Sequence, residues 1–107
     1  MEGADALGVR EFQKQIEAIY FQKDNARGAI ECFAWFVEEV GELSRALRGT
    51  DRQNLEEEFA DVFAWLVTLA SIKGVDLAAA SQKYSGGCPR CSSTPCACRR
   101  REGKQEA

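Results

Sequence analysis

Three glycines divide most of the chain into segments with helical periodicity. Between Gly28, Gly49 and Gly74, apolar residues recur at three- and four-residue intervals, and no useful length alternates apolar and polar residues. The first spacing is that of one face of an α-helix, whereas alternation marks a half-buried strand. Glycine commonly follows the last residue of a helix. The pattern therefore predicts an all-α protein.

We expect four helices, separated by breaks that contain glycine. They cover residues 9–23, 29–48, 52–73 and 77 to about 84, and the first break covers residues 24–28. A chain of 107 residues forms one domain at most, and a domain this small buries only a modest part of its surface. We therefore expect a four-helix bundle whose core is completed by oligomerisation.

The composition excludes several functions. The chain has no histidine, so a Ser-His-Asp triad and any His-ligated metal site are impossible. Residues 1–87 carry 9 basic and 15 acidic side chains, a balance of −6, and residues 88–107 carry 5 and 2, a balance of +3. An acidic body argues against general nucleic-acid binding, which needs a basic surface. It does leave room for a cation among clustered carboxylates.

No segment of the sequence predicts export or membrane insertion. The start of the chain is short and acidic, without an apolar run behind it. The longest apolar stretch, residues 62–72, is shorter than the ~20 residues that span a bilayer. We expect a cytoplasmic protein, with no membrane partner and with reduced thiols.

Two predicted helices carry groups of carboxylates on one face. Glu38, Glu39 and Glu42 lie on the second helix, and Glu58 and Asp61 lie one turn apart on the third. Two antiparallel helices joined by a short turn would bring these groups face to face. Like charges so placed destabilise helices unless a cation joins them. Oxygen ligands without His or Cys point to Mg²⁺ or Mn²⁺.

The alternative for these carboxylates is a solvated acidic face, and we interpret Glu56 and Glu57 in that way. The groups on both helices also lie in apolar sequence that includes Trp35 and Trp65. Each tryptophan could stack on a nucleotide base, or both could belong to the helical core. Cys32 is expected to be a small buried apolar residue.

The order Glu38-Glu39-x-x-Glu42, fifteen residues, then Glu58-x-x-Asp61 resembles the signature of the MazG-like all-α nucleotide pyrophosphohydrolases. Residues 35–43 resemble the most recognisable stretch of that family, and Asp24-x-x-Arg27-Gly28 resembles its approach to the signature. The resemblance extends from about Phe12 to Lys83, roughly two thirds of the chain.

This resemblance implies a hydrolase that cleaves a ribo- or deoxyribonucleoside triphosphate to a monophosphate and pyrophosphate. It implies that Mg²⁺ is held by Glu39, Glu42, Glu58 and Asp61. Glu38 would bind a second ion or orient the attacking water. It also implies a homo-oligomer, a dimer or a tetramer, with sites assembled between helices of two subunits.

Basic residues outside the carboxylates are candidates for contacts with the triphosphate. Lys23, Arg27 and Lys83 could each bind phosphate, or each could be an ordinary solvated side chain. Lys83 is the preferred candidate, because the family often places a basic residue at this point of the fourth helix.

The last segment differs from the rest. We divide the chain into a helical domain, residues 1–85, and a cysteine-rich basic tail, residues 86–107. The tail contains Cys88-x-x-Cys91 and Cys96-x-Cys98, which form either a four-thiolate Zn²⁺ knuckle or a reduced, disordered tail. Residues 99–101 are three arginines that could add weak affinity for nucleic acid or phosphate.

Two other functions compete with the hydrolase. One is a non-enzymatic helical oligomer, an adaptor that presents a zinc-binding basic tail to a protein or RNA partner. The other is an acidic helical oligomer without any site. Mg²⁺-dependent turnover that is lost on Glu42→Gln or Asp61→Asn separates the hydrolase from both.

Overall fold

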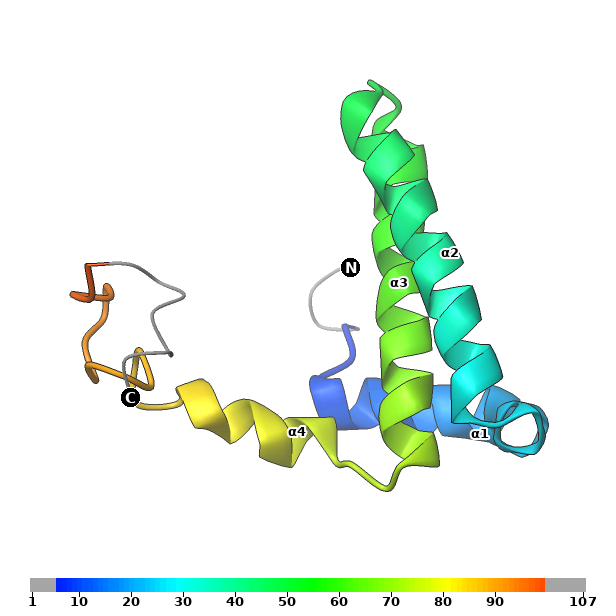
Figure 1. Cartoon of the computed structure of the whole chain (residues 1–107), viewed down its shortest axis with the longest axis horizontal. Coiled ribbons are helices and arrows are strands. Elements are labelled where there is room, and N and C mark those ends of the chain that lie inside the picture. Colours follow the sequence, from blue (N-terminus) through cyan, green and yellow to red (C-terminus); the bar gives the residue numbers. More distant parts are fainter. Residues whose placement is uncertain (1–5, 100–107) are drawn as a thin grey trace. The chain divides into compact units, whose positions relative to one another are not determined.

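The computed structural model describes residues 6–99, which form four α-helices and one 3-10 helix, with no strand among them (Figure 1). The elements are α1 (Val9–Arg27), α2 (Ala29–Arg48), α3 (Arg52–Ile72), α4 (Leu77–Ala80) and η2 (Ser81–Tyr84). The predicted all-α class is confirmed. The chain divides into two compact units, a helical unit up to Leu77 and a C-terminal unit from Ala78 onward.

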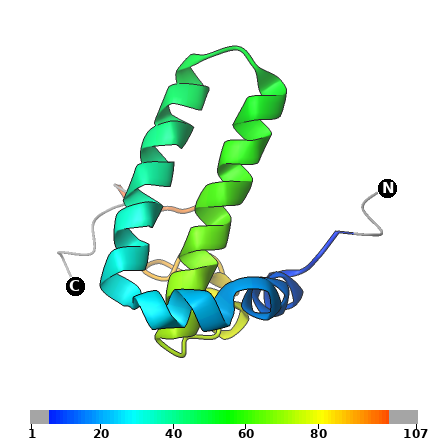
Figure 2. The same ribbon diagram turned by 90° about the vertical axis from the view of Figure 1, so that its right-hand side faces the viewer.

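Helices α2 and α3 form an antiparallel hairpin in the helical unit (Figure 2). At the end of α2, the backbone N–H of Gly49 donates to the carbonyl of Ala46. Asp51 caps α3, because its side chain accepts a hydrogen bond from the backbone N–H of Asn54 at 3.1 Å. The short turn between these two residues places the two carboxylate-bearing helices side by side, as the sequence predicts.

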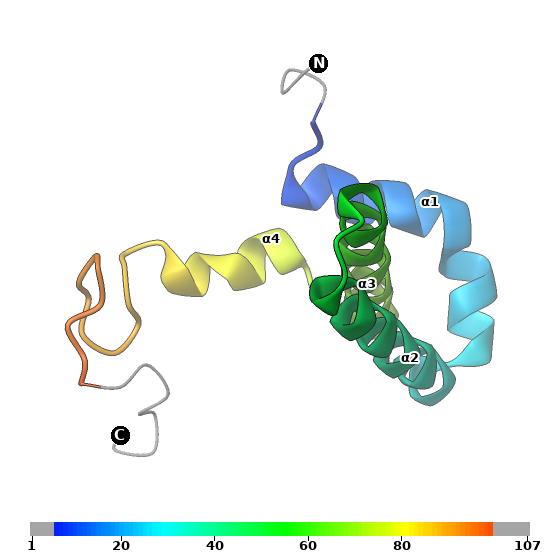
Figure 3. The same cartoon turned by 90° about the horizontal axis from the view of Figure 1, so that it is seen from above.

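Helix α1 runs across this hairpin rather than along it, and it contacts both other helices (Figure 3). Gln13 fixes the crossing. Its buried amide donates to the hydroxyl of Ser71 at 3.1 Å and to the carbonyl of Val75 at 2.8 Å. The rings of Phe12 and Phe63 stack beside it, with centroids 4.7 Å apart. These contacts attach α1 to the C-terminal half of α3.

The predicted break over residues 24–28 is wrong except at its last residue. Helix α1 continues to Arg27, and only Gly28 leaves helical geometry, with φ of 90°. Asp24 does not end the helix, because its side chain is engaged elsewhere. It is buried, and its carboxylate accepts a hydrogen bond from the hydroxyl of Thr68 at 3.2 Å. An Asp side chain disfavours a helix interior because it can hydrogen-bond to the nearby backbone instead. Here the bond with Thr68 engages the Asp24 side chain, so that competition is removed.

The helical unit buries few apolar side chains. Cys32 is fully buried, as expected, together with Val67. Many large apolar residues of α2 and α3 remain exposed in the single chain: Phe33, Trp35, Val37, Val40, Phe59, Phe63 and Leu66. So much exposed apolar surface is unusual for a protein that works alone. Completion of the core by another chain stays a prediction.

The predicted fourth helix begins at Leu77, the last residue of the helical unit, and tightens from α to 3-10 geometry at Ser81. Residues 85–99 then form turns and irregular backbone. The predicted domain boundary at residue 85 stays a prediction, and Arg100 and Arg101 lie outside the described residues. Within residues 6–99, no single helix is long and apolar enough to cross a membrane.

Candidate active site

Three of the predicted carboxylates converge between α2 and α3. Glu39 comes from α2, and Glu58 and Asp61 come from α3, one helical turn apart. One oxygen atom from each side chain lies within 4.8 Å of the other two. Glu39 and Glu58 are half-buried, whereas Asp61 is exposed. The group therefore has an enclosed inner side and an open outer side, and we call it the carboxylate cluster.

One atom of the carboxylate cluster lacks any partner. The Oε1 atom of Glu58 is buried and forms no hydrogen bond. Among residues 6–99, no Lys or Arg side chain pairs with Glu39, Glu58 or Asp61. A buried carboxylate oxygen without a partner is costly, so a proton or a cation is needed there. Carboxylate oxygens alone suit a hard divalent cation, so the cluster could hold Mg²⁺ or Mn²⁺.

The pKa of Glu39 also reflects its burial and the negative charges around it. Burial raises the pKa of Glu39 above its ordinary value, and the negative charges of Asp61 and Glu58 raise it further. A hydrogen bond with Glu58 and the charge of Glu42 act in the same direction. The cluster thus binds positive charge, as protons or as a metal ion, more readily than isolated carboxylates do.

The other two predicted carboxylates are placed differently. Glu38 and Glu42 are exposed, and neither belongs to a group of converging ligand atoms among the described residues. Glu42 acts on Glu39 through its charge. The sequence predicts five carboxylates in one site, and the structure gathers three of them. The roles of Glu38 and Glu42 stay predictions.

A pocket of about 230 Å³ opens beside the carboxylate cluster. It is lined by Tyr20, Lys23, Asp24, Arg27, Asp61, Ala64, Trp65 and Thr68. Asp61 belongs both to the pocket and to the cluster. Lys23 and Arg27 bring two positive charges from α1, and Trp65 brings an aromatic face from α3. The pocket therefore combines features that suit a phosphorylated aromatic ligand.

Four pocket residues were missed as site residues by the sequence reasoning: Tyr20 and Asp24 on α1, and Ala64 and Thr68 on α3. Tyr20 was assigned to the apolar stripe of the first helix, and Asp24 to the break after it. Both lie at helical spacing from Arg27, so they share its face once α1 extends that far. The misplaced helix end therefore hid this face of α1.

The two tryptophans lie one turn away from the cluster along their helices. The rings of Trp35 and Trp65 are nearly parallel, with centroids 6.5 Å apart and an interplanar angle of 18°. Trp35 is 46% exposed, so it is not fully enclosed in a core. Trp65 lines the pocket, whereas Trp35 does not. A contact of either ring with substrate stays a prediction.

Comparison with known families settles the relationship of the chain. The model of the MazG nucleotide pyrophosphohydrolase domain matches residues 28–91, more than half of the sequence. The chain belongs to the MazG family. A search of curated proteins found no match. The MazG match contains α2, α3 and the entire carboxylate cluster, and family membership indicates a nucleotide pyrophosphohydrolase.

Lys83, which lies within the MazG match, belongs to the C-terminal unit. It is exposed, and its ammonium group lies 5.6 Å from the centroid of the Tyr84 ring. It lines a pocket of about 470 Å³ formed by the C-terminal unit, together with Tyr84, Cys88 and Arg90. Its predicted contact with the triphosphate stays a prediction.

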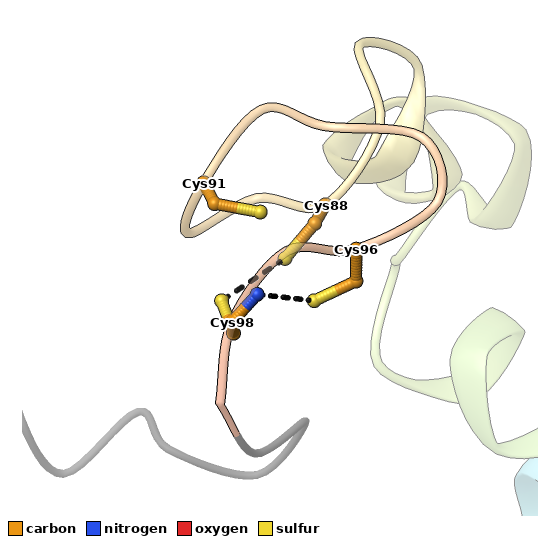
Figure 4. Close-up of side chains that lie close together, drawn as sticks. All are labelled: Cys88, Cys91, Cys96 and Cys98. Carbon is orange, nitrogen blue, oxygen red and sulfur yellow. Dashed lines mark hydrogen bonds between the residues drawn. The ribbon is translucent and has the colours of Figure 1, made fainter.

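The four cysteines of the tail form a second group of converging ligand atoms (Figure 4). The Sγ atoms of Cys88, Cys91, Cys96 and Cys98 all lie within 4.8 Å of one another, and no disulfide joins them. We call them the thiol cluster. The MazG match ends at Cys91, so it contains the first two of these residues and not the last two.

The four thiols differ in acidity. Backbone N–H groups of Ala97 and Ser93 lower the pKa of Cys91 to about 6. The pKa of Cys98 is raised to about 12, first by a hydrogen bond with Cys96 and then by burial. Backbone N–H groups of Cys91 and Arg90 lower the pKa of Cys88. The loop thus stabilises negative sulfur on one side of the cluster.

Proposed function

We propose that this MazG protein hydrolyses nucleoside triphosphates to monophosphates and pyrophosphate, with Mg²⁺ bound at the carboxylate cluster. The observation that carries the proposal is the convergence of Glu39, Glu58 and Asp61 around a buried oxygen of Glu58 that lacks a partner. Family membership supplies the reaction class, and the neighbouring pocket supplies a place for the substrate.

The carboxylates in and beside the cluster would have two roles, metal binding and activation of water. Glu39, Glu58 and Asp61 would hold the metal ion, and Glu42 would complete its oxygen ligands. A bound Mg²⁺ neutralises phosphate charge and makes a coordinated water more acidic. Glu38, which is exposed beside this group, would orient the attacking water or accept its proton.

The pocket would hold the substrate next to these carboxylates. Lys23 and Arg27 would bind phosphate oxygens, because their charges offset the negative cluster. Trp65 would stack on the base, and Trp35 would support its ring from the opposite helix. Asp61 links the two regions, so a phosphate bound near it would lie within reach of the metal ligands.

The working form would be a homo-oligomer, a dimer or a tetramer. The exposed apolar residues of α2 and α3 provide a surface for a second chain. Size-exclusion chromatography with light scattering tests this directly, and a monomer at micromolar concentration would contradict it. Lys83 would contact the triphosphate in this form.

Product analysis tests the reaction. Purified protein is incubated with Mg²⁺ and a panel of ribo- and deoxyribonucleoside triphosphates, and the products are separated by ion exchange. We expect monophosphate and pyrophosphate, abolished by EDTA. Diphosphate and orthophosphate would reject cleavage between the α and β phosphates. No turnover by folded, oligomeric protein would favour the zinc-bearing adaptor over the hydrolase.

A matched pair of variants tests the site. Glu58→Gln removes the charge of this half-buried carboxylate at nearly constant volume, and we expect kcat/KM to fall roughly 10²-fold or more. Glu57→Gln makes the same change one residue away, at an exposed side chain that bonds Gln53, and should retain activity. Equal activity of the two variants would place the metal elsewhere.

A further inference from the structure

The thiol cluster has the spacing of a mononuclear metal site. All four sulfur atoms lie within 4.8 Å of one another, and those of Cys88 and Cys98 are 3.9 Å apart. In a tetrahedral zinc site, Zn–S bonds of about 2.3 Å place neighbouring sulfurs about 3.8 Å apart. The four side chains therefore come close to a zinc geometry through the path of the backbone alone (Figure 4).

The backbone of residues 87–93 is closed by its own hydrogen bonds. The N–H of Cys88 donates to the carbonyl of Ser93 at 3.0 Å, and the N–H of Ser92 donates to the carbonyl of Cys88 at 2.7 Å. Gly87 has φ of 100°, and a Cβ there would lie 2.7 Å from Oγ1 of Thr94. The loop is thus a specific structure that requires glycine, and it returns the chain toward its second pair of cysteines.

Backbone N–H groups also point at the sulfur atoms. The N–H of Ala97 donates to Sγ of Cys91, and the N–H of Cys98 donates to Sγ of Cys96, both at 3.3 Å. Donors so placed stabilise negative charge on the acceptor. Metals bind cysteine sulfur in its negatively charged form, so donors in these positions suit sulfur ligands.

The C-terminal unit has little else to hold it together. Among residues 78–99 no side chain is buried, and the unit contains no disulfide. A small segment without an apolar core needs a cross-link or a metal ion to keep one conformation. The ordered loop around the thiols is therefore unexplained by packing.

We propose that Cys88, Cys91, Cys96 and Cys98 bind one Zn²⁺, which stabilises the C-terminal unit. Four protein ligands fill the tetrahedral sphere and leave no open position, so the role is structural rather than catalytic. Binding converts thiols to thiolates and releases their protons to solvent, with no change of oxidation state. The proposal goes beyond the hydrolase and does not depend on it.

Metal analysis and cobalt substitution test the site on the whole chain under reducing conditions. We expect about one Zn²⁺ per chain by elemental analysis. Replacement by Co²⁺ should give the intense visible absorption of a tetrahedral thiolate complex, and X-ray absorption should report sulfur ligands at about 2.3 Å from zinc. None of these measurements uses hydrolysis, so failure here is distinct from failure of the proposed function.

Three variants assign the ligands. The double change Cys88→Ser and Cys91→Ser should abolish the cobalt absorption. Cys32→Ala removes the one cysteine outside the cluster and should leave the absorption unchanged. Gly87→Ala keeps all four thiols but opposes the loop conformation, and should weaken zinc binding at least tenfold.

Three results would overturn the proposal. They are a folded, reduced protein that binds no Zn²⁺ or Co²⁺, disulfide bonds among the four cysteines in protein purified without oxidant, and iron in place of zinc. As a readout independent of spectroscopy, we expect hydrogen exchange across residues 87–98 to slow when zinc is bound. Unchanged exchange would contradict the structural role.

Discussion

The molecule contains two groups of converging ligand atoms, and they are built in opposite ways. The carboxylate cluster joins residues of two long helices, whereas the thiol cluster lies within 11 consecutive residues of irregular backbone. Helix α3 of the first cluster is attached to α1 by buried polar contacts that involve no metal ligand. The second cluster has no buried neighbour in its own unit among residues 78–99.

This difference indicates what each metal would do. The helix that carries Glu58 and Asp61 is held by contacts that use no metal ligand, so a cation there would be available for chemistry. The thiol loop has no comparable scaffold, so its ion would contribute to folding itself. Ligand type agrees with this division, because oxygen atoms suit Mg²⁺ and four thiolates suit Zn²⁺.

The largest expected effect is that a variant of either cluster impairs the property of that cluster and not the property of the other. Asp61→Asn should lower kcat/KM roughly 10²-fold or more and leave zinc content unchanged. The double change Cys88→Ser and Cys91→Ser should remove zinc and lower hydrolysis by folded protein far less than Asp61→Asn does. Turnover and elemental analysis on the same preparations check both. Loss of both properties in either variant would break the comparison, because the clusters would then be coupled.

A second test concerns the hydrogen bond between Asp24 and Thr68, two residues that line the pocket. Thr68→Val keeps the side-chain shape but leaves the buried carboxylate of Asp24 without its hydroxyl donor. We expect the free energy of unfolding to fall by about 1–3 kcal/mol. Urea denaturation of the helical signal measures it, with the exposed Thr50→Val as the control. Equal stability would mean that this contact does not support the helical unit.

A third test measures how the affinity of the carboxylate cluster for Mg²⁺ depends on pH. The raised pKa of Glu39 means that protons compete with Mg²⁺ up to a higher pH than at an ordinary carboxylate. We expect the affinity for Mg²⁺ to weaken as pH falls through that raised pKa, by up to about tenfold per pH unit for one displaced proton. Titration calorimetry at constant ionic strength measures it. An affinity independent of pH would exclude Glu39 as a ligand.

The stability of the metal-free protein should depend on pH in the opposite direction to the affinity for Mg²⁺. Between the ordinary pKa of a glutamate, about 4.3, and the raised pKa of Glu39, the folded chain binds more protons than the unfolded chain. This contribution to stability is complete below the ordinary pKa, and it is lost as pH rises through the raised one. Thermal unfolding in EDTA across this window should show it, and added Mg²⁺ should remove it.

The smallest expected effect is a gain in the stability of the metal-free protein. Glu39→Gln removes one of the repelling charges, so the metal-free protein should become more stable by a few tenths of a kcal/mol while activity is lost. Glu57→Gln, outside the cluster, should give no such gain. Chemical denaturation in EDTA compares them. Destabilisation by Glu39→Gln would mean that the carboxylates do not repel one another in the folded state.

Much of this protein could be predicted from residues that lie close together in the sequence. The bounds of α2 agree with the prediction, and those of α3 agree within one residue, because apolar periodicity and glycine breaks act locally. The carboxylates of the two helices could be assigned to one face for the same reason. The MazG resemblance rests on that local pattern and is confirmed by the family match.

The tertiary structure decided what local spacing leaves open. It placed Asp24 in a buried hydrogen bond, and α1 continued to Arg27, so that Asp24 and Arg27 line the pocket beside Tyr20 and Lys23. It also gathered Glu39, Glu58 and Asp61 while leaving Glu38 and Glu42 exposed. Helical spacing places side chains on a face. Which of them meet depends on the register and crossing of packed helices, which no single segment encodes.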